Sequence, residues 1–344
     1  MRKEVLAVGC ALMVFCGCGK NNAAQHYESG WAAMGKKDYT TAVNEFQQVI
    51  DQNSRLAESY RAEGIAYYSE KAYPEAIAAF SRSLNNMDDP DKEFKKDVQF
   101  YLAQARMDYG EVDKAIEVYS EILKAGEDEQ AFFLRGKAYI SMEDYKNAEK
   151  DFQRALEGCE DYNLYINIYQ IYVDHNKAVD GDAYLKMALE LEPQDGEDCY
   201  HRGRIYEYEK NYEAARDELK TAMEQGYEDA MLLLGRVYLE MEDPASARSM
   251  YQEYLQKSEQ GAKAYNGLAM CDIYDGAYDS ALENIAQGLK ENSKDDEQGL
   301  LYNEIVAYEY KRDFATAKEK MKIYLEQYPE DEAALRENEF LSTR

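Results

Sequence analysis

Proline and positive charge are both scarce in this 344-residue chain. There are only 5 prolines, so helices can run without interruption, and 45% of the residues are hydrophobic. Only 40 Lys and Arg stand against 68 Asp and Glu, which gives a net charge of −28 at pH 7. A field of that sign repels nucleic acid and anionic lipid headgroups. The composition predicts one long helical array that binds no nucleic acid.

Histidine is equally scarce, and this limits the chemistry that the chain can perform. The three histidines are His26, His175 and His201. Cys199 and His201 lie two residues apart on a predicted helix, so they point about 200° apart and cannot form a nucleophile–base pair. The chain has no Gly-rich phosphate loop, HExxH, CxxC or GxSxG motif. We therefore expect no enzyme, no metal site and no cofactor.

A short segment recurs eight times along the chain. Its second residue is Tyr39, Tyr73, Val112, Tyr145, Tyr212, Pro244, Tyr278 or Phe314. The steps between these residues run from 32 to 39, apart from one step of 67 that holds two periods. A fixed period near 34 residues is typical of a helical hairpin that is copied and stacked.

Each repeat combines small residues with one large residue. A small residue precedes the segment at Gly30, Gly64, Ala103, Gly136, Gly203, Gly235 and Ala269. Inside the segment, alanine stands at 42, 76, 115, 148, 215, 247, 281 and 317. Four residues later the side chain is large and apolar, at Phe46, Phe80, Tyr119, Phe152, Leu219, Tyr251, Ile285 and Met321. Small residues let two antiparallel helices approach closely, and the large residue fills the space between them.

These residues resemble the tetratricopeptide repeat over roughly residues 24–329. The resemblance implies an all-α, right-handed superhelical solenoid of about nine helical hairpins, whose first helices line a concave groove. Pro193 and Pro329 close repeats in the way the family often does. The family's lysine–asparagine clamp for terminal carboxylates does not recur here as a unit.

Three places depart from the period. The stretch Tyr162 to Pro193 predicts a diverged ninth repeat, with Gly181 nearest to the missing alanine and a distorted turn at Asp180-Gly181. The step of 39 predicts a longer connection around Pro90. Residues 330–344 are predicted to form a capping helix and tail, because a repeat array must cover its last apolar face.

Six acidic clusters could be mistaken for metal sites. They read GEDEQ, GCEDYN, DGEDC, GYEDA, SKDDEQ and PEDEA, and each falls at the start of a predicted first helix. Asp and Glu at that position accept hydrogen bonds from free backbone N–H groups and complement the helix dipole. We therefore interpret them as helix caps.

The N-terminus resembles a bacterial lipoprotein signal. Two basic residues precede an apolar run from Val5 to Phe15, which is too short to span a bilayer, and then Gly17-Cys18. We predict a signal peptide at 1–17, a lipid on Cys18 and a tether at 18–23, which places the chain on the outer side of a bacterial cell membrane. The alternative is an ordinary signal peptide that is cut nearby.

Besides Cys18, which is predicted to carry the lipid, three cysteines remain after the signal: Cys159, Cys199 and Cys271. They lie in different repeats, and a disulfide needs α-carbons within about 7 Å. We expect three unpaired, mostly buried thiols.

Helical phase predicts which residues line the groove. The predicted partner-binding residues are Trp31, Arg61, Tyr68, Phe100, Phe133, Lys137, Tyr200, Arg204, Arg236 and Tyr302, and the same phase adds Leu232, Asn266 and Met270. Aromatic rings combined with arginine are typical of binding hot spots. A peptide could place apolar side chains on the rings and give a carboxylate to Lys137, Arg204 or Arg236.

We therefore expect a membrane-anchored module that binds a protein or peptide in its groove. A second hypothesis is a structural scaffold in an envelope complex for secretion, outer-membrane assembly or polysaccharide export, in which the other faces matter. A hydrolase hidden in the repeat fold is a third, since fold alone does not exclude it.

Overall fold

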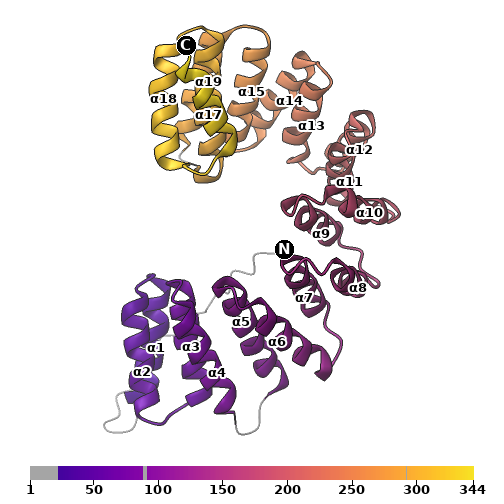
Figure 1. Ribbon diagram of the computed structural model, residues 1–344. Helices are drawn as coiled ribbons and strands as arrows, with labels where there is room; N and C mark the ends of the chain where they lie inside the picture. Colours follow the sequence, from indigo (N-terminus) through magenta and orange to yellow (C-terminus); the bar gives the residue numbers. More distant parts are fainter. Residues whose placement is uncertain (1–21, 88–90, 292) are drawn as a thin grey trace. The chain divides into compact units, whose positions relative to one another are not determined.

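The computed structural model describes residues 22–87, 91–291 and 293–344. Across these ranges the chain forms nineteen α-helices and no β-strand (Figure 1). The helices are α1 (Asn22–Gly35), α2 (Tyr39–Asp51), α3 (Leu56–Ser69), α4 (Tyr73–Asn85), α5 (Lys92–Tyr109), α6 (Val112–Ala125), α7 (Glu129–Ser141), α8 (Tyr145–Ala155), α9 (Tyr162–Asp174), α10 (Ala178–Leu189), α11 (Gly196–Tyr208), α12 (Tyr212–Glu224), α13 (Ala230–Glu240), α14 (Pro244–Lys257), α15 (Ala262–Tyr274), α16 (Tyr278–Lys290), α17 (Lys294–Tyr310), α18 (Phe314–Gln327) and α19 (Glu332–Ser342).

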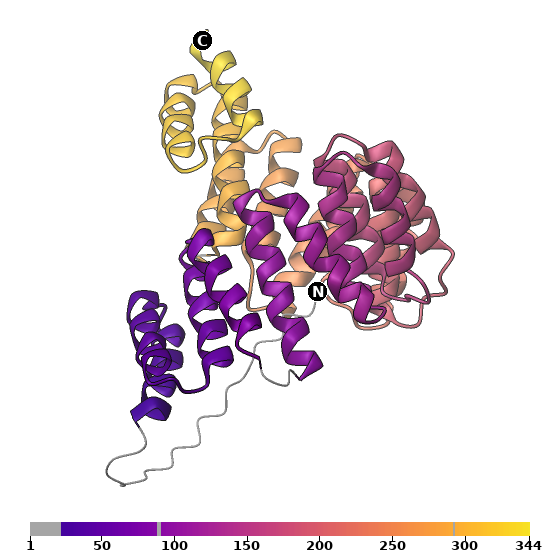
Figure 2. The ribbon, with the colours of Figure 1, turned by 60° about the horizontal axis from the view of Figure 1, so that its bottom comes forward.

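The helices α1 to α18 pair into nine hairpins, and α19 follows as a single helix. The predicted all-α fold of about nine hairpins with a capping helix is therefore confirmed. The chain divides into two compact units, Met1–Asp182 and Ala183–Arg344, and the division falls within α10. Within each unit, successive hairpins stack side by side (Figure 2).

In seven of the nine hairpins, a small residue on the first helix faces a large residue sixteen positions later on the second helix; Tyr169 takes the place of the small residue in α9–α10, and Ile305 takes it in α17–α18. A β-carbon added to Gly64 of α3 would lie 2.6 Å from Cε1 of Phe80 on α4. The same contact joins Gly136 to Phe152 at 2.7 Å. All eight large residues and all eight alanines of the repeats are buried. This small–large pair sets how closely the two helices approach, as the sequence pattern predicts.

The core is a strip that passes from hairpin to hairpin. One buried cluster runs from Ala76 and Phe80 of α4 through α5 and α6 to Ala131 of α7. Because each hairpin packs only on its neighbours, the stability of a unit is close to a sum of similar local contributions.

The turn inside every hairpin has a residue in the left-handed region, two positions before the second helix begins. The nine residues are Lys37, Lys71, Gly110, Glu143, Asn176, Lys210, Glu242, Gly276 and Arg312. The next residue donates its N–H to the carbonyl five positions earlier, at 2.7–3.0 Å in all nine turns. This hydrogen bond closes the end of the first helix and reverses the chain. Only two of the nine positions hold glycine, so the sequence gives little sign of the conformation.

The diverged repeat forms a regular hairpin of α9 and α10, and its predicted turn is corrected. Asp180 and Gly181 lie inside α10, while the chain reverses at His175 to Lys177. Gly181 is buried at the alanine position of the other repeats, where an added β-carbon would lie 3.0 Å from Cβ of Tyr172. Glycine is present because α9 brings tyrosine side chains against this point of α10.

The remaining boundaries are as follows. Helix α1 begins at Asn22, inside the segment 18–23 that we predict as a tether, and Cys18 lies outside the described residues. The longer connection expected near Pro90 lies between α4 and α5, and residues 88–90 are not described. The final helix spans Glu332–Ser342, within the predicted cap. Cys159, Cys199 and Cys271 are unpaired, and the last two are buried, as expected.

Exchanging Gly64 for alanine tests the small–large pair. The added methyl would overlap the Phe80 ring, so Gly64→Ala should lower the free energy of unfolding by about 1–3 kcal/mol. Another repeat combines Ala269 with Ile285, so Phe80→Ile should relieve most of that cost. Chemical denaturation of the two single variants and the double variant measures this coupling. An equal cost of Gly64→Ala in both backgrounds would show that the two positions do not interlock.

A buried carboxyl group lies in α3. Glu63 is only 3% exposed. Its burial raises the pKa to about 7 from an ordinary 4.5; Arg82 opposes this rise and Asp51 adds to it. A carboxyl group whose pKa is raised by folding resists ionisation in the native state. The unit therefore loses stability as pH rises from 4.5 through 7.

Removing the charge of Glu63 should abolish this loss. At pH 8, Glu63→Gln should unfold at higher denaturant concentration than the parent chain, with a gain of about 1–3 kcal/mol. Near pH 3 the two proteins should differ little, because Glu63 is then mostly protonated in both states. Glu28→Gln on the exposed face of α1 is the control and should be neutral at both pH values. A gain from Glu63→Gln that does not depend on pH would contradict this account.

Candidate functional site

A hollow of about 500 Å³ lies in the second unit, along the first helices of successive hairpins. We refer to it as the inner hollow. Its lining residues are Tyr200 of α11, Asp229, Leu232, Leu233 and Arg236 at and along α13, Tyr251 and Tyr254 of α14, Gln260, Lys263, Asn266, Gly267 and Met270 at and along α15, and Asp296 and Gly299 of α17. Of the predicted groove residues, Tyr200, Arg236, Leu232, Asn266 and Met270 lie in it.

Glycines shape this hollow. The ring of Tyr251 packs between Gly235 of α13 and Gly267 of α15, where added β-carbons would lie 2.6 Å and 2.3 Å from it. Gly299 leaves the facing side of α17 without a side chain. Glycine inside a helix costs about 1 kcal/mol relative to alanine. At Gly267 the close approach of the Tyr251 ring leaves no room for a β-carbon, which explains why glycine is present despite this cost.

A pair of side-chain amides joins α15 and α17 at the wall of the hollow. The side-chain amide of Asn303 on α17 donates to the side-chain oxygen of Asn266 on α15 at 2.8 Å. In this repeat, Ile305 occupies the position where most other repeats have glycine or alanine, and Asn303 lies two residues before it. The pair joins two first helices directly and leaves polar groups of Asn266 at the wall of the hollow.

Arg236, a predicted partner-binding cation, is already paired within the protein. Its guanidinium donates two hydrogen bonds to the carboxylate of Glu207 on α11, at 2.5 and 2.7 Å. Burial lowers and the Glu207 carboxylate raises the pKa of Arg236, with a net rise. Bidentate pairs of this kind are strong and directional. This geometry therefore does not support the prediction that Arg236 is available to bind a carboxylate of a partner.

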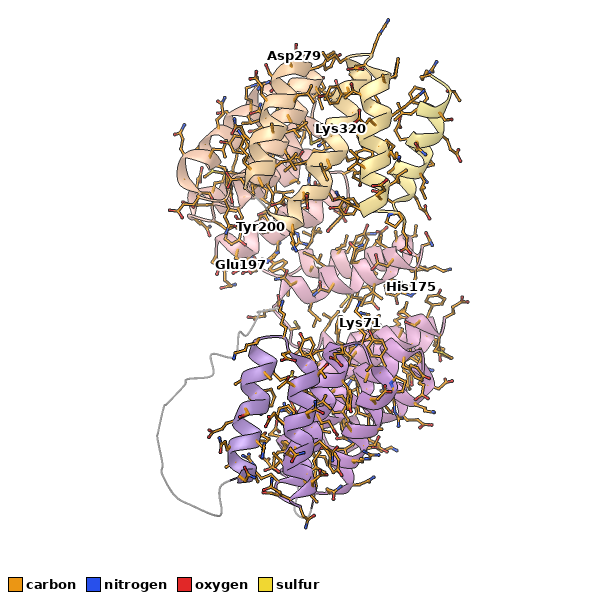
Figure 3. The ribbon with its side chains drawn as sticks, turned by 90° about the vertical axis from the view of Figure 1, so that its left-hand side faces the viewer. Lys71, His175, Glu197, Tyr200, Asp279 and Lys320 are labelled. Atoms are coloured by element: carbon orange, nitrogen blue, oxygen red, sulfur yellow. The ribbon has the colours of Figure 1, made fainter. Side chains whose placement is uncertain are left out.

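Acidic and aromatic side chains meet at one end of the inner hollow. The rings of Tyr200 and Tyr227 lie 4.9 Å apart. Glu197 and Tyr200 stand one turn apart on α11 (Figure 3). Burial raises the pKa of Tyr227 to about 12, and the nearby carboxylates of Glu197 and Asp229 act in the same direction. Arg204, another predicted groove residue, has its guanidinium carbon 5.9 Å from the Tyr200 ring centroid and its Nη1 3.3 Å from Nδ1 of His201.

The groove residues of the first unit are mostly engaged in internal contacts. Arg61 pairs with Asp97 of α5 and lies 5.3 Å from the Tyr101 ring centroid. The Tyr68 hydroxyl donates to Asp108. Lys137 of α7 is exposed, and no side chain in the described ranges pairs with it. It is thus the cation of the predicted set that is best placed to meet a partner.

The predicted aromatic residues are half-buried and continue the hairpin cores. Trp31 lies 5.6 Å from Phe46, Phe100 lies 6.4 Å from Tyr119, and Phe133 lies 6.1 Å from Phe152. Tyr302 lies 5.8 Å from Tyr324 in the last hairpin. Each of these rings contacts an aromatic ring of its own second helix, so packing accounts for much of its position.

Several lining residues were missed by the analysis of helical phase. Asp229, Lys263 and Asp296 lie at the starts of α13, α15 and α17, one turn or more before the positions that we predicted. Their spacing of 34 and 33 residues repeats the period of the array. Asp229 and Lys263 each lie fifteen residues before the second residue of their segment, Pro244 and Tyr278, and Gly299 holds this position before Phe314, so one repeat position forms a row along the hollow.

The acidic clusters act mainly as caps, as predicted. Asp128, Asp161, Asp195 and Asp331 accept hydrogen bonds from backbone N–H groups at the starts of α7, α9, α11 and α19. The clusters before α13 and α17 differ, because neither Asp229 nor Ser293 at the capping position makes a side-chain capping hydrogen bond within the described residues. Asp229 holds the capping position with helical backbone angles, and within the described part of the chain its carboxylate makes no capping hydrogen bond.

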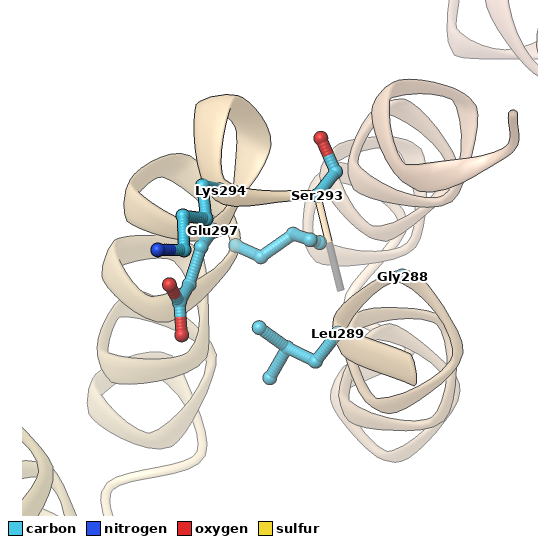
Figure 4. Close-up of a pocket in the computed structure, with 6 residues that line it drawn as sticks. Gly288, Leu289, Ser293, Lys294 and Glu297 are labelled. Carbon is cyan, nitrogen blue, oxygen red and sulfur yellow. The ribbon is translucent and has the colours of Figure 1, made fainter. Parts of the chain in front are cut away.

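A second, smaller cavity of about 220 Å³ lies between the end of α16 and the start of α17. Figure 4 shows Leu289 pointing toward Lys294 and Glu297 at its mouth. No predicted groove residue lines it. Across the described ranges, no group of three or more His, Cys, Asp or Glu side chains could hold a metal ion. None of the helices described here has the length and apolar character needed to cross a bilayer.

Stacked hairpins with a hollow along their first helices define a helical-repeat protein. A tetratricopeptide repeat model matches residues 27–91, 200–262 and 232–297, and a second model of the same repeat matches residues 129–161. Together these ranges take in more than half of the chain. The chain belongs to the tetratricopeptide repeat family, and it is accordingly a protein–protein interaction module.

The chain is similar to several solved structures. Yeast Tom70 is 15% identical with a TM-score of 0.50, over 89% of this chain and 78% of that one. A tetratricopeptide repeat protein from Parabacteroides merdae ATCC 43184 is 15% identical with a TM-score of 0.47, over 83% and 99%. YrrB, described as having an unusual peptide-binding site, is 26% identical with a TM-score of 0.36, over 55% and 97%. A search of curated proteins found no match.

Proposed function

We propose that the protein is a lipid-anchored module on the outer side of a bacterial membrane, which binds a protein or peptide partner in the inner hollow. The observation that carries the binding role is the hollow itself. It runs along first helices of successive hairpins, and it keeps apolar surface exposed in a strongly acidic protein: Met270 at its wall is 40% exposed. Apolar surface in a concave site with a polar rim is typical of a place where a partner binds.

The anchor is supported by the N-terminal sequence. The apolar run from Val5 to Phe15 is followed by Gly17-Cys18, the pattern that resembles a lipoprotein signal. One acyl chain gives only weak membrane binding, so stable anchoring of this acidic protein requires more than one chain on Cys18. Because the chain carries a net charge of −28, anionic headgroups do not attract the rest of the protein.

The alternative is a structural scaffold of an envelope complex. Apolar side chains are exposed on other faces of the second unit as well, including Ile323 on α18 at 45% and Leu335 on α19 at 43%. A scaffold would use such faces to hold several components. The two proposals therefore differ in which surface binds.

Capture from native membranes distinguishes them. The intact protein serves as bait, and crosslinked products are identified together with the positions of the crosslinks. Met270→Glu places a charge in the hollow and should reduce capture of the partner about fivefold or more, because an apolar contact is lost and a carboxylate is buried. Ile323→Glu on α18 is the matched control and should leave capture unchanged.

Crosslinks from Lys263 to one protein are expected. Loss of capture by Ile323→Glu alone, with crosslinks on the outer helices, would establish the scaffold instead.

Partition between detergent and water tests the anchor. Wild-type protein expressed in a bacterial host should enter the detergent phase, and Cys18→Ser should move it to the aqueous phase because the lipid attachment is lost. Cys16→Ser changes a neighbouring cysteine and should have no effect. An aqueous wild-type protein would favour an ordinary signal peptide.

A further inference from the structure

The charges inside the inner hollow are unequally matched. The guanidinium of Arg236 is held by both oxygens of Glu207. The ammonium of Lys263 lies 3.9 Å from a carboxylate oxygen of Asp296. Both cations that line the hollow therefore have an acidic neighbour within the protein. A partner's carboxylate would have to compete with these neighbours, which makes the hollow a poor acceptor of negative charge.

Asp229 is the carboxylate that remains. It is exposed at the start of α13 and lines the hollow, and no cation pairs with it in the part of the chain that the structure describes. It is also not used as a helix cap, unlike its counterparts Asp128 and Asp195 before α7 and α11. Its charge is thus uncompensated at a concave surface, where complementary charge on a partner gains most.

Aromatic faces stand next to this carboxylate. Tyr200 and Tyr227 form a tilted pair with centroids 4.9 Å apart, and the carboxylate of Glu197, which lies 3.8 Å from Nε2 of His201, is close enough to act on Tyr227. Arg204 lies 5.9 Å from the Tyr200 ring centroid and also acts on the Tyr227 hydroxyl, but among the described residues no cation lies over the Tyr227 ring. Carboxylates beside tyrosine faces attract ammonium and guanidinium groups.

The other wall of the hollow is apolar. Leu232 lies one helical turn beyond Asp229 on α13, and Met270 of α15 keeps 40% of its surface exposed. The whole chain carries a net charge of −28, which steers cationic segments toward it and repels acidic ones. Local pairing and overall field therefore favour the same sign of ligand.

We infer that the inner hollow takes a segment of a partner protein in which a lysine or arginine stands next to an aliphatic residue. The cation lies between Asp229 and the Tyr227 ring, with Glu197 nearby, and the aliphatic side chain lies on Leu232 and Met270. The inference rests on the proposed binding function and names its partner chemistry. It reverses the sign expected from the sequence, in which cations of the groove receive a carboxylate.

Two peptide probes test the sign of the ligand. An acetylated, amidated and fluorescently labelled hexapeptide that alternates lysine with leucine is titrated with the full-length protein in detergent, and its binding is followed by anisotropy. The same peptide with glutamate in place of lysine is the comparison. The lysine peptide should bind at least about tenfold more tightly at low salt, and its affinity should fall as salt is raised.

Removing Asp229 locates the cation. Asp229→Ala should weaken the lysine peptide about five- to tenfold, since a carboxylate–cation contact at a partly enclosed aromatic site is lost. Glu224→Ala removes the same charge from the exposed end of α12 and should leave affinity unchanged. Melting curves of both variants should match the parent, because Asp229 makes no capping bond within the described residues.

Each other outcome has a definite meaning. Tighter binding of the glutamate peptide would overturn the assignment of the cation while leaving the hollow as a binding site. Equal effects of Asp229→Ala and Glu224→Ala would show that only the overall charge attracts the peptide, and would also overturn it. Binding of neither peptide would contradict the hollow as a peptide site altogether.

Discussion

The structure depends on one contact that is repeated in almost every hairpin: a residue with little or no side chain on the first helix faces a large apolar residue sixteen positions later. Gly64 against Phe80 and Gly203 against Leu219 show how little space is left, since an added β-carbon would lie 2.6 Å from the facing side chain in both. Overlap of this size cannot be relieved by small shifts in a packed interior. The contact therefore fixes the separation of the two helices, which in turn sets where the first helices lie, and the inner hollow is formed from their exposed sides.

The electrostatic character of the hollow follows from this packing. Because first helices of neighbouring repeats lie close together, a long cation on one can reach a carboxylate on the next, as Arg236 reaches Glu207 and Arg61 reaches Asp97. An acidic protein offers many such acceptors, so its few arginines are used within the array. The groups left for a partner are those that packing does not use, and Asp229 and Lys137 are of this kind.

The repeat itself could be predicted from the sequence because packing ties it to residue size at fixed spacing. The combination of a small residue such as Gly30, an alanine such as Ala42 and a large residue such as Phe46 recurs in most hairpins, and a period of this kind is visible without a structure. Ion pairing could not be predicted in the same way. Whether Arg236 is free depends on a side chain 29 positions away and on the rotamers of both residues. The left-handed conformation of the turns could not be predicted for a different reason. Six of the nine left-handed positions hold Lys, Glu or Arg, which do not favour this conformation by themselves. The helix-closing hydrogen bond of each turn imposes it instead.

Such turns bear on how an array of this kind can change its length. Every hairpin contains its own helix-closing turn, and most contain their own small–large contact, so a whole repeat can be duplicated or lost with its internal geometry intact. A single inserted residue, by contrast, rotates everything after it by about 100° and separates the glycine from its ring. Evolution can therefore adjust the reach of the binding surface only in whole hairpins. The hairpin α9–α10 differs in sequence from the other repeats but keeps their geometry. Its Gly181 takes the place of the usual alanine and packs against tyrosine side chains of α9.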